Sequence, residues 1–465
     1  MSVNIELLGR ELSKIVGSEY VSSKSDVLTA YLLDETPDAV IPSPARSLVL
    51  VKPRSTEEVS SILKLANSHN VPVFVRGGGT GLVGAAVPTR DGIILSMERF
   101  NKILEIDREN LMATVEAGVT LGDFLRKVDE EGLYFPPHPG DEGAQIGGLV
   151  VCNAGGSRAV KYGVMRNYVR GMEVVLPTGE VLNLGGKLIK DNFGFDLMQL
   201  IIGSEGVLGI VTKVVLRLYP KFPASATLII GFDRRSDAVR FVPEILRSGI
   251  IPMAVEYVER ELVLRSAEHL GEEWPAKEGN TFIMIILQER SEDEVLSMAE
   301  SIDEIAGKFG ALGTLITDNR REQDRILNIR SNIYTALKPD TVDILDVAVP
   351  PAKMGEFMDK LDEIAKEYEI YLPAYGHVAD GNVHPHIMKE EAGGPSPSQV
   401  EEVRRKIYDV AISLGGVITG EHGIGSTRIS YLEKYMQPEA LNLMRQIKRM
   451  LDPRNILNPD KVIPS

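Results

Sequence analysis

The chain contains 465 residues, of which 43% are hydrophobic and 25% charged, a composition typical of a soluble globular protein with roughly three units of about 150 residues. Its formal net charge of −15 argues against nucleic acid and anionic membrane surfaces as partners. The amino-terminal residues lack the pattern of a signal peptide, no run approaches the roughly 18 apolar residues of a membrane span, and the single Cys152 excludes an internal disulfide, so we expect a cytoplasmic protein.

The first 220 residues predict a mixed α/β unit with several antiparallel pieces. After a helix and an irregular arm over 1–45, Ser55 to Glu58 form a capping box that opens a helix. A β-rich run at 71–75 follows, and a glycine loop at 76–81 leaves its carboxyl end. Further along, the patterns predict a strand over 111–118, a helix over 121–131 capped by Thr120, a hairpin over 172–184 and a strand over 207–218.

Glycine, with 43 residues, is concentrated in clusters that suggest backbone running close to a ligand. Three clusters lie at 76–81, 137–156 and 203–209. Consecutive backbone N–H groups without side chains form a nest for anionic oxygens, and Arg76 adds a positive charge beside the first loop. Each loop by itself is equally compatible with tight turns, but the three together suit a long dinucleotide held along its length.

The proline-containing segment 219–223 predicts a domain boundary. Beyond it, strand-like runs and amphipathic helical patterns indicate an α+β domain whose helices cover an antiparallel sheet. The predicted strands are 226–232, 281–287 and 342–349, and the predicted helices are 237–248, 292–308, 353–368 and 399–414. A last helix at 438–451 begins a tail that we expect to pack back onto the earlier domains.

Four of the seven histidines lie in two short segments near the carboxyl end of the chain. In the first segment, the Asp-Gly pair at 380–381 predicts a turn between two β-like flanks. A hairpin there brings His377 and His384 together across the strands, and His384 shares one strand face with His386.

The second segment carries Glu421 and His422 among glycines. Imidazoles with a carboxylate suit Zn²⁺, Mn²⁺ or Fe²⁺, and these residue types do not choose between the three. The alternative is structural, since a single histidine is more often hydrogen-bonded than metal-bound. The clustering of four histidines within glycine-rich turns favours the divalent metal.

The order of these motifs resembles that of a known flavoprotein superfamily. RGGGTGL at 76–82, then PHPG, IGG and NAGG within 137–156, then GSEGVLGIVT at 203–212 resemble the FAD-binding domain of the vanillyl-alcohol oxidase / p-cresol methylhydroxylase (PCMH) superfamily. More closely, from about residue 40 onward the chain is similar to FAD-linked D-lactate dehydrogenases, glycolate oxidases and D-2-hydroxyglutarate dehydrogenases.

The resemblance implies an α+β fold in three parts. A PCMH-type FAD-binding domain of two α/β subdomains would cover 1–220. An α+β substrate or cap domain with an antiparallel sheet would cover 221–415, and the segment 416–465 would pack back on the FAD-binding domain.

The resemblance also implies how FAD is held. The first two loops would wrap the pyrophosphate and isoalloxazine, Ile210 and Val211 would lie near the adenine or ribose, and Asn458 would approach the flavin ring. Some relatives link FAD covalently through a histidine in the first loop, where this chain has Thr80, so we expect non-covalent FAD. His138 in the second loop is open between a turn residue and a flavin contact. The residues implied for the cofactor are Arg76, Gly77, Gly78, Gly79, Thr80, Gly81, Leu82, Pro139, Gly140, Gln145, Gly148, Asn153, Gly155, Gly156, Ile210, Val211 and Asn458.

His-x6-His followed by Glu-His resembles the metal-and-base motif of the D-2-hydroxy acid dehydrogenases. By this resemblance His377, His384 and Glu421 are the metal ligands and His422 is the general base. Flavin N5 would take the hydride from C2 of a small D-2-hydroxy acid while His422 takes the hydroxyl proton, which yields the 2-oxo acid.

An anionic substrate in an acidic protein needs local positive charge, and Arg330 is the candidate carboxylate clamp because relatives place a substrate-binding arginine there. The alternative is a helix-surface arginine in a salt bridge. Where D-2-hydroxyglutarate enzymes add a lysine this chain has Ile344, and Tyr334 replaces a small hydroxyl residue, so a D-lactate-like, glycolate-like or medium-chain acid is favoured. The residues implied for substrate binding are Arg330, Tyr334, Asn382 and His386.

Other functions compete with this one. A sugar-acid or alditol oxidase of the same superfamily fits the loops but not the metal motif. An FAD-carrying subunit of a multi-subunit glycolate oxidase-type complex also fits, whereas a flavin-free metallohydrolase leaves the glycine loops unexplained. The sequence has no haem or iron–sulfur motif, so electrons would leave to a quinone, a carrier protein or a partner subunit. A homodimer or a place in a complex, peripheral to a membrane through a partner, is compatible with the sequence.

Overall fold

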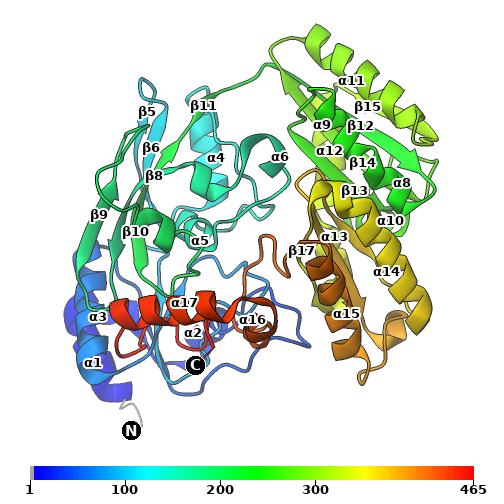
Figure 1. Ribbon diagram of the computed structural model, residues 1–465. Helices are drawn as coiled ribbons and strands as arrows, with labels where there is room; N and C mark the ends of the chain where they lie inside the picture. Colours follow the sequence, from blue (N-terminus) through cyan, green and yellow to red (C-terminus); the bar gives the residue numbers. More distant parts are fainter. Residues whose placement is uncertain (1–4, 465) are drawn as a thin grey trace. The chain divides into compact units, whose positions relative to one another are not determined.

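Two units make up the chain in the computed structural model, which describes residues 5–464 (Figure 1). The first unit takes in the residues up to Ala154, then Val164–Lys221 and the segment from Glu421 onward. The second takes in Gly155–Gly163 and Phe222–Gly420. Within the described part of the chain, none of the helices combines the length and apolar character needed to cross a bilayer.

One sheet of the first unit combines parallel and antiparallel strands. Strands β2 (Leu48–Val51) and β3 (Val73–Arg76) both pair in parallel with β4 (Gly92–Ser96), and β1 (Val21–Ser22) pairs antiparallel with β2. Helix α3 (Thr56–His69) begins where the Ser55 side chain accepts a hydrogen bond from the Glu58 backbone N–H. The first glycine loop leaves β3 directly, so the predicted order of helix, strand and loop is confirmed.

A second sheet of the first unit is antiparallel throughout. Its order is β5 (Ile103–Asp107), β6 (Met112–Glu116), β10 (Ile210–Arg217), β8 (Val169–Val175) and β9 (Val181–Gly185). The predicted hairpin is the β8–β9 pair, whose turn is closed by bonds between Leu176 and Glu180 and between Gly179 and Leu176. Helix α5 (Ile146–Cys152), which follows the second glycine loop, packs against β10.

The remaining elements of the first unit are short strands, helices and 3₁₀ turns. They are β7 (Leu133–Tyr134), β11 (Tyr219–Pro220), α1 (Ile5–Val16), α2 (Ser25–Leu28), α4 (Leu121–Glu130), α7 (Met198–Ile201), α16 (Ile429–Tyr435), α17 (Pro438–Leu451), η1 (Ser18–Tyr20), η2 (Thr29–Tyr31) and η3 (Met165–Asn167).

The second unit is built on an antiparallel sheet. Its strand order is β15 (Gly313–Thr317), β12 (Ala224–Phe232), β14 (Thr281–Glu289), β13 (Ala254–Glu259), β18 (Ala374–His377), β19 (Asn382–Met388) and β16 (Thr341–Ile344), with β17 (Val347–Ala348) also paired to β19. Helix α11 (Glu292–Gly307) packs on β12 and β14, and α10 (Arg260–Leu270) packs on β13. The predicted antiparallel sheet covered by helices is confirmed.

The remaining elements of the second unit are helices and short turns. They are α6 (Ala159–Tyr162), α8 (Arg235–Arg240), α9 (Val242–Arg247), α12 (Arg320–Ser331), α13 (Ile333–Leu337), α14 (Met354–Tyr368), α15 (Val400–Ser413), η4 (Lys338–Asp340), η5 (Pro351–Lys353) and η6 (Glu390–Ala392).

Two predicted elements of the second unit are interrupted. The helix expected over 237–248 is two helices, α8 and α9, which meet at Phe241, because Pro243 in the first turn of α9 has no N–H to continue the ladder. The strand expected over 342–349 is broken between β16 and β17. This second break contains Asp346, which is fully buried.

Candidate active site

The β18–β19 hairpin of the second unit carries the predicted histidines. His377 ends β18, Asp380 and Gly381 form the turn, and β19 returns with Tyr375 opposite His384. The rings of His377 and His384 lie with their centroids 5.5 Å apart at an angle of 83°. The predicted hairpin therefore brings these two imidazoles together, and both are buried.

Asp346 is a member of this cluster that the sequence reasoning missed. Its carboxylate accepts hydrogen bonds from Asn382 Nδ2 at 2.9 Å and from Thr419 Oγ1 at 2.7 Å. Its Oδ1 lies 3.5 Å from Nδ1 of His384. A fully buried carboxylate held by a histidine and an amide in the break of a strand is an unusual and costly arrangement. The signal available in the sequence was a charged residue within the largely apolar run predicted as a strand over 342–349.

A possible metal-binding group includes Asp346, His384, Glu421 and His422. The backbone N–H of Gly420 donates to Asp346 O at 2.8 Å, and Glu421 and His422 are the next two residues in the chain. Imidazole nitrogens and carboxylate oxygens are the donors that Zn²⁺, Mn²⁺ and Fe²⁺ accept, so the residues fit a divalent cation of this class.

His422 and Glu421 lie in a tightly held loop of the first unit. Their side chains are 12% and 16% exposed, and Nε2 of His422 is 4.0 Å from Oε1 of Glu421. Glu205, from the third glycine loop, accepts hydrogen bonds from the backbone N–H groups of Ile424 and Gly425, both at 2.8 Å. The sequence predicted Glu205 only as part of the third glycine loop. In the structure its carboxylate binds the backbone of the segment that follows His422.

Arg330 and His377 share one buried carboxylate, that of Glu256 on β13. Arg330 Nε lies 2.6 Å and Nη2 2.5 Å from Oε2 of Glu256, while His377 Nδ1 lies 2.6 Å from Oε1. Burial by itself would raise the pKa of Glu256, but the charges of Arg330 and His377 and their hydrogen bonds outweigh it and hold that pKa below its ordinary value. The Nε edge of Arg330 thus faces Glu256, which leaves Nη1 as the nitrogen that Glu256 does not engage.

The other residues implied for substrate binding surround this hairpin. His386, on β19, is fully buried, and its Nδ1 is 3.2 Å from Oγ1 of Thr341. Its ring centroid lies 5.3 Å from that of Tyr375 and 6.2 Å from that of Tyr334 on α13. The Arg330 guanidinium lies 4.8 Å from the centre of the Tyr375 ring. Arg330 and His386 therefore both lie against Tyr375, and Tyr334 lies on His386.

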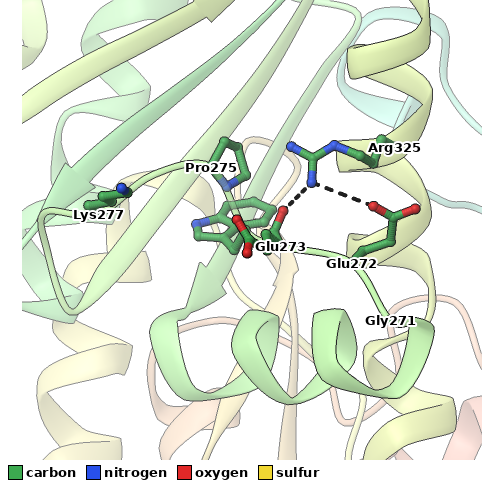
Figure 2. A pocket seen from close by; sticks show the side chains of 7 residues that line it. Gly271, Glu272, Glu273, Pro275, Lys277 and Arg325 are labelled. Atoms are coloured by element: carbon green, nitrogen blue, oxygen red, sulfur yellow. Dashed lines mark hydrogen bonds and ion pairs between the residues drawn. The ribbon is translucent and has the colours of Figure 1, made fainter.

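A separate pocket of the second unit shares no residue with this cluster. It has a volume of about 550 Å³ and is lined by Gly271, Glu272, Glu273, Trp274, Pro275, Lys277 and Arg325 (Figure 2). Arg325, which Figure 2 shows beside Glu272 and Glu273, donates to the Glu273 carbonyl and lies 3.8 Å from the Glu272 carboxylate. The carbonyl of Glu273 and the carboxylate of Glu272 already bind the Arg325 guanidinium, so this arginine is not available to bind an anionic substrate.

In the first unit, the first glycine loop is held by its neighbours. The Arg76 guanidinium donates to the carbonyls of Leu33 and, at 3.5 Å, Ala30, so it anchors the arm before β2. Gly79 has φ of +75°, and a Cβ there would overlap the Arg76 side chain, so only glycine fits. Asn458 in the tail accepts from the Val75 N–H at 3.0 Å. Thr80, Gly81 and Leu82 continue this loop in irregular backbone.

The second glycine loop faces the first. Gly78 lies so close to the loop that a Cβ would come within 2.5 Å of the Gly143 carbonyl oxygen. Gln145 precedes α5, and its Oε1 is buried with no hydrogen-bond partner within the described residues. A Cβ at Gly148 would meet open space. An unsatisfied buried acceptor and open backbone between two glycine loops fit a polar, elongated ligand such as FAD.

The other residues implied for FAD lie on both sides of α5 and in the third loop region. Asn153 ends α5 in a left-handed conformation, and its Oδ1 accepts from the Arg166 N–H at 3.0 Å. Asn458 Nδ2 donates to the Gly206 carbonyl of the third loop at 2.9 Å. Ile210 and Val211 open β10 and are buried, and Pro139, Gly140, Gly155 and Gly156 lie in the loops that flank α5.

Lys461, in the tail, bonds to the segment that follows the first glycine loop. Its Nζ donates to the Gly84 carbonyl at 2.6 Å and is almost fully buried, and burial lowers the lysine pKa from 10.5 to about 8 despite the nearby charges of Asp34, Asp460 and Glu205. Because the unfolded chain keeps the ordinary lysine pKa, it binds more protons than the folded chain between pH 8 and pH 10.5. The free-energy cost of burying the charged lysine is therefore relieved progressively as pH rises through that window, and the fold becomes more stable.

We expect the wild type to become more stable relative to Lys461→Met as pH rises above 8. The gain in its free energy of unfolding should be up to about 1.4 kcal/mol per pH unit. Urea denaturation of both proteins from pH 7 to pH 10 measures this difference. A difference that stays constant over this range would contradict the assignment of the shift to Lys461.

Comparison with known proteins gives consistent matches over the whole chain. Residues 47–185 match the model of an FAD binding domain, and residues 222–462 match the model of the FAD linked oxidases, C-terminal domain. The chain is 46% identical to a D-lactate dehydrogenase of Archaeoglobus fulgidus over 97% of this chain and 98% of that protein. It is 36% identical to the glycolate oxidase subunit GlcD of Bacillus subtilis over 97% and 96% of the two chains.

Solved structures agree at the level of the fold. A p-cresol methylhydroxylase with substrate bound matches with a TM-score of 0.76 and 20% identity, covering 98% of this chain and 96% of that one. The 4-ethylphenol oxidase from Gulosibacter chungangensis matches with a TM-score of 0.77 and 20% identity, covering 100% and 98%. The predicted PCMH-type architecture and the predicted resemblance to D-lactate dehydrogenases and glycolate oxidases are both confirmed.

Proposed function

The chain belongs to the family of FAD-linked oxidases and is an FAD-linked oxidoreductase, and we propose that it oxidises a small D-2-hydroxy acid, D-lactate-like or glycolate-like, to the 2-oxo acid. The observation that carries the proposal is the concentration of imidazoles, carboxylates and one guanidinium on and around the β18–β19 hairpin. A hydroxyl next to a carboxylate is the substrate pattern that such a set can recognise.

We propose that FAD lies along the three glycine loops and that a divalent cation is bound through His377, His384 and Glu421, with Asp346 as a further candidate ligand. His384, Glu421 and Asp346 belong to the possible metal-binding group, whereas His377 is outside that group and is included because its ring lies beside that of His384. FAD, when bound, supplies the electron acceptor for the hydride of C2. A divalent cation, when bound, supplies a Lewis acid for the substrate hydroxyl and carboxylate. The separate observations in support are the buried acceptor of Gln145 for FAD, and the group of Asp346, His384, Glu421 and His422 for the cation.

The chain's own residues then bind the substrate and move one proton. His422 takes the hydroxyl proton as C2 loses its hydride, because a neutral imidazole is a suitable base near neutral pH. Arg330, with Nη1 directed away from its bond to Glu256, binds the substrate carboxylate. Tyr334, Asn382 and His386 shape the remaining surface, and all but Tyr334 are buried.

Gly148 provides a test of the FAD position. Gly148→Ala is expected to lower FAD affinity strongly, because the open space at its Cβ is where we place the cofactor. The apoprotein should be at least as stable as the wild type, since alanine is favoured over glycine within a helix by about 1 kcal/mol. Flavin absorbance per protein after gel filtration, and thermal melting of the apoprotein, measure the two effects.

Gly9→Ala is the matched control, because Gly9 is also a helical glycine with open space at its Cβ, on α1. It should gain similar stability without loss of flavin. Equal flavin content in both variants would remove Gly148 from the cofactor site.

The substrate proposal is tested with a panel of D- and L-2-hydroxy acids and an artificial dye as electron acceptor. We expect reduction of the dye with D-lactate or glycolate, little with L-lactate, and little with D-2-hydroxyglutarate, because the buried Ile344 offers no charge to a second carboxylate. Preference for D-2-hydroxyglutarate, or no dye reduction with any acid of the panel, would contradict the proposal.

A second candidate is an FAD-carrying subunit of a glycolate oxidase-type complex. The observation that favours it is the match to GlcD, which is named a subunit, over 96% of its length. In that case electrons leave to a partner subunit, and otherwise to a quinone or a carrier protein. Dye reduction by the purified chain alone, compared with reduction of a soluble quinone by the same sample, distinguishes these acceptors.

A further inference from the structure

Glu256 joins two residues that the proposed function uses for different tasks. It lies on β13 with 1% of its surface exposed, and its Cα pairs with that of His377 across the β13–β18 ladder. Arg330 arrives from α12 and meets one carboxylate oxygen, and His377 meets the other. A single buried carboxylate thus restrains a guanidinium and an imidazole from separate elements.

The chemistry of a carboxylate determines what it does to each partner. Ionised Glu256 can only accept hydrogen bonds, so Nδ1 of His377 carries the proton and its lone pair is on Nε2. Nε2 is then the atom suited to bind a cation. The planar guanidinium of Arg330 is fixed through its Nε edge, so the orientation of Nη1 is set as well.

We propose that Glu256 is a positioning residue that sets both the tautomer of His377 for metal binding and the orientation of Arg330 for the substrate carboxylate. This inference rests on the proposed function, since it assumes that His377 and Arg330 have those tasks. Carboxylates that accept the second N–H of a metal-bound histidine fix its ring and raise its basicity. Here the same carboxylate also orients Arg330, which is proposed to bind the carboxylate of the substrate.

A purely structural ion pair on the same strand provides the comparison. Glu259 is also buried on β13, and its Oε1 lies 3.1 Å from Nη2 of Arg235. It contacts the backbone N–H of Ala374 and the hydroxyl of Tyr257, none of which belongs to the candidate site. Loss of the Glu259 charge therefore tests the effect of removing a buried carboxylate from this strand.

Glu256→Gln removes the charge and keeps the shape. The amide offers one acceptor and one donor, so either His377 or Arg330 meets an N–H instead of an oxygen. An N–H facing His377 would move the imidazole proton to Nε2, and an N–H facing Arg330 would push the guanidinium away. We expect Mn²⁺ affinity about 10- to 100-fold lower than in the wild type, a higher KM for D-lactate, and unchanged FAD content.

The experiment uses the FAD-loaded enzyme after chelation, titrated with Mn²⁺ alone by equilibrium dialysis and then assayed with D-lactate at increasing Mn²⁺. The proposal expects weaker Mn²⁺ binding in Glu256→Gln but not in Glu259→Gln, with kcat recovering at high Mn²⁺ while KM stays raised. A structural loss alone would lower the melting temperature of both variants and would not recover with metal.

The proposal is overturned if Glu256→Gln binds Mn²⁺ and D-lactate as the wild type does, or if both variants lose Mn²⁺ affinity equally. Should the glutamine variant not fold, Glu256→Asp keeps the buried charge but shortens the side chain, and the same decrease in Mn²⁺ affinity is expected. A wild type that oxidises D-lactate without binding Mn²⁺ also overturns the inference. A wild type that does neither contradicts the proposed function itself.

Discussion

Replacing His422 with alanine is expected to lower kcat for D-lactate by about 10²- to 10⁴-fold while the purified protein stays yellow. The reason is that the variant loses the group proposed to take the hydroxyl proton, whereas the glycine loops of the first unit are untouched. The loop itself should persist, because Glu205 holds the backbone of Ile424 and Gly425 independently of the imidazole. Steady-state dye reduction and the flavin spectrum are the measurements.

His269→Ala is the control for this experiment, since His269 is an exposed histidine on α10 with no task in the proposal. It should retain wild-type turnover. Wild-type turnover by His422→Ala would remove His422 from the mechanism, and loss of flavin from that variant would show that the residue serves the cofactor instead.

Removing the divalent cation with a chelator should lower turnover of D-lactate by about 10²- to 10³-fold without releasing FAD. A Lewis acid that polarises the reacting oxygen is worth several kcal/mol, and each 1.4 kcal/mol corresponds to about tenfold in rate. The flavin spectrum should persist because the proposed ligands lie outside the three glycine loops. Assays before and after chelation, with absorbance of the bound flavin, check both statements.

Restoration distinguishes metal loss from damage. Adding back Mn²⁺ or Zn²⁺ should restore turnover, and a chelator already saturated with Zn²⁺ should have no effect on the untreated enzyme. His384→Ala should reproduce the chelated state and resist restoration, because its imidazole belongs to the possible metal-binding group and lies 3.5 Å from Asp346. Full turnover after exhaustive chelation would exclude the metal from the reaction.

Local sequence patterns predicted the elements whose formation depends on neighbouring residues. The capping serine at Ser55 and the turn at 380–381 act within a few residues of the chain, and both elements are where the patterns place them. The hairpin then determines that His377 and His384 meet, because pairing across a short turn leaves little freedom of register.

Contacts between distant segments could not be predicted in the same way. Asp346 lies in a run that reads as an ordinary strand, and no element was predicted around Glu256, so only the partners brought by α12, β18 and β19 show why charge is buried at these two positions. Arg76 is a similar case: it is predicted as a cofactor contact, and the structure adds that its guanidinium donates to the carbonyls of Leu33 and Ala30. Its position beside the glycine loop follows from the sequence alone, whereas its hydrogen-bond partners depend on the tertiary fold.

The discontinuous first unit has a consequence for how the protein is made on the ribosome. Strand β3 finds a neighbour in the tail, where the backbone of Ile456 and Asn458 bonds to that of Val73 and Leu457 pairs with it in parallel. These residues are translated after all of the second unit, which can therefore fold while the nascent chain is still growing. The first unit lacks this neighbour of β3 until the tail has been translated, so we expect it to complete its folding after translation ends.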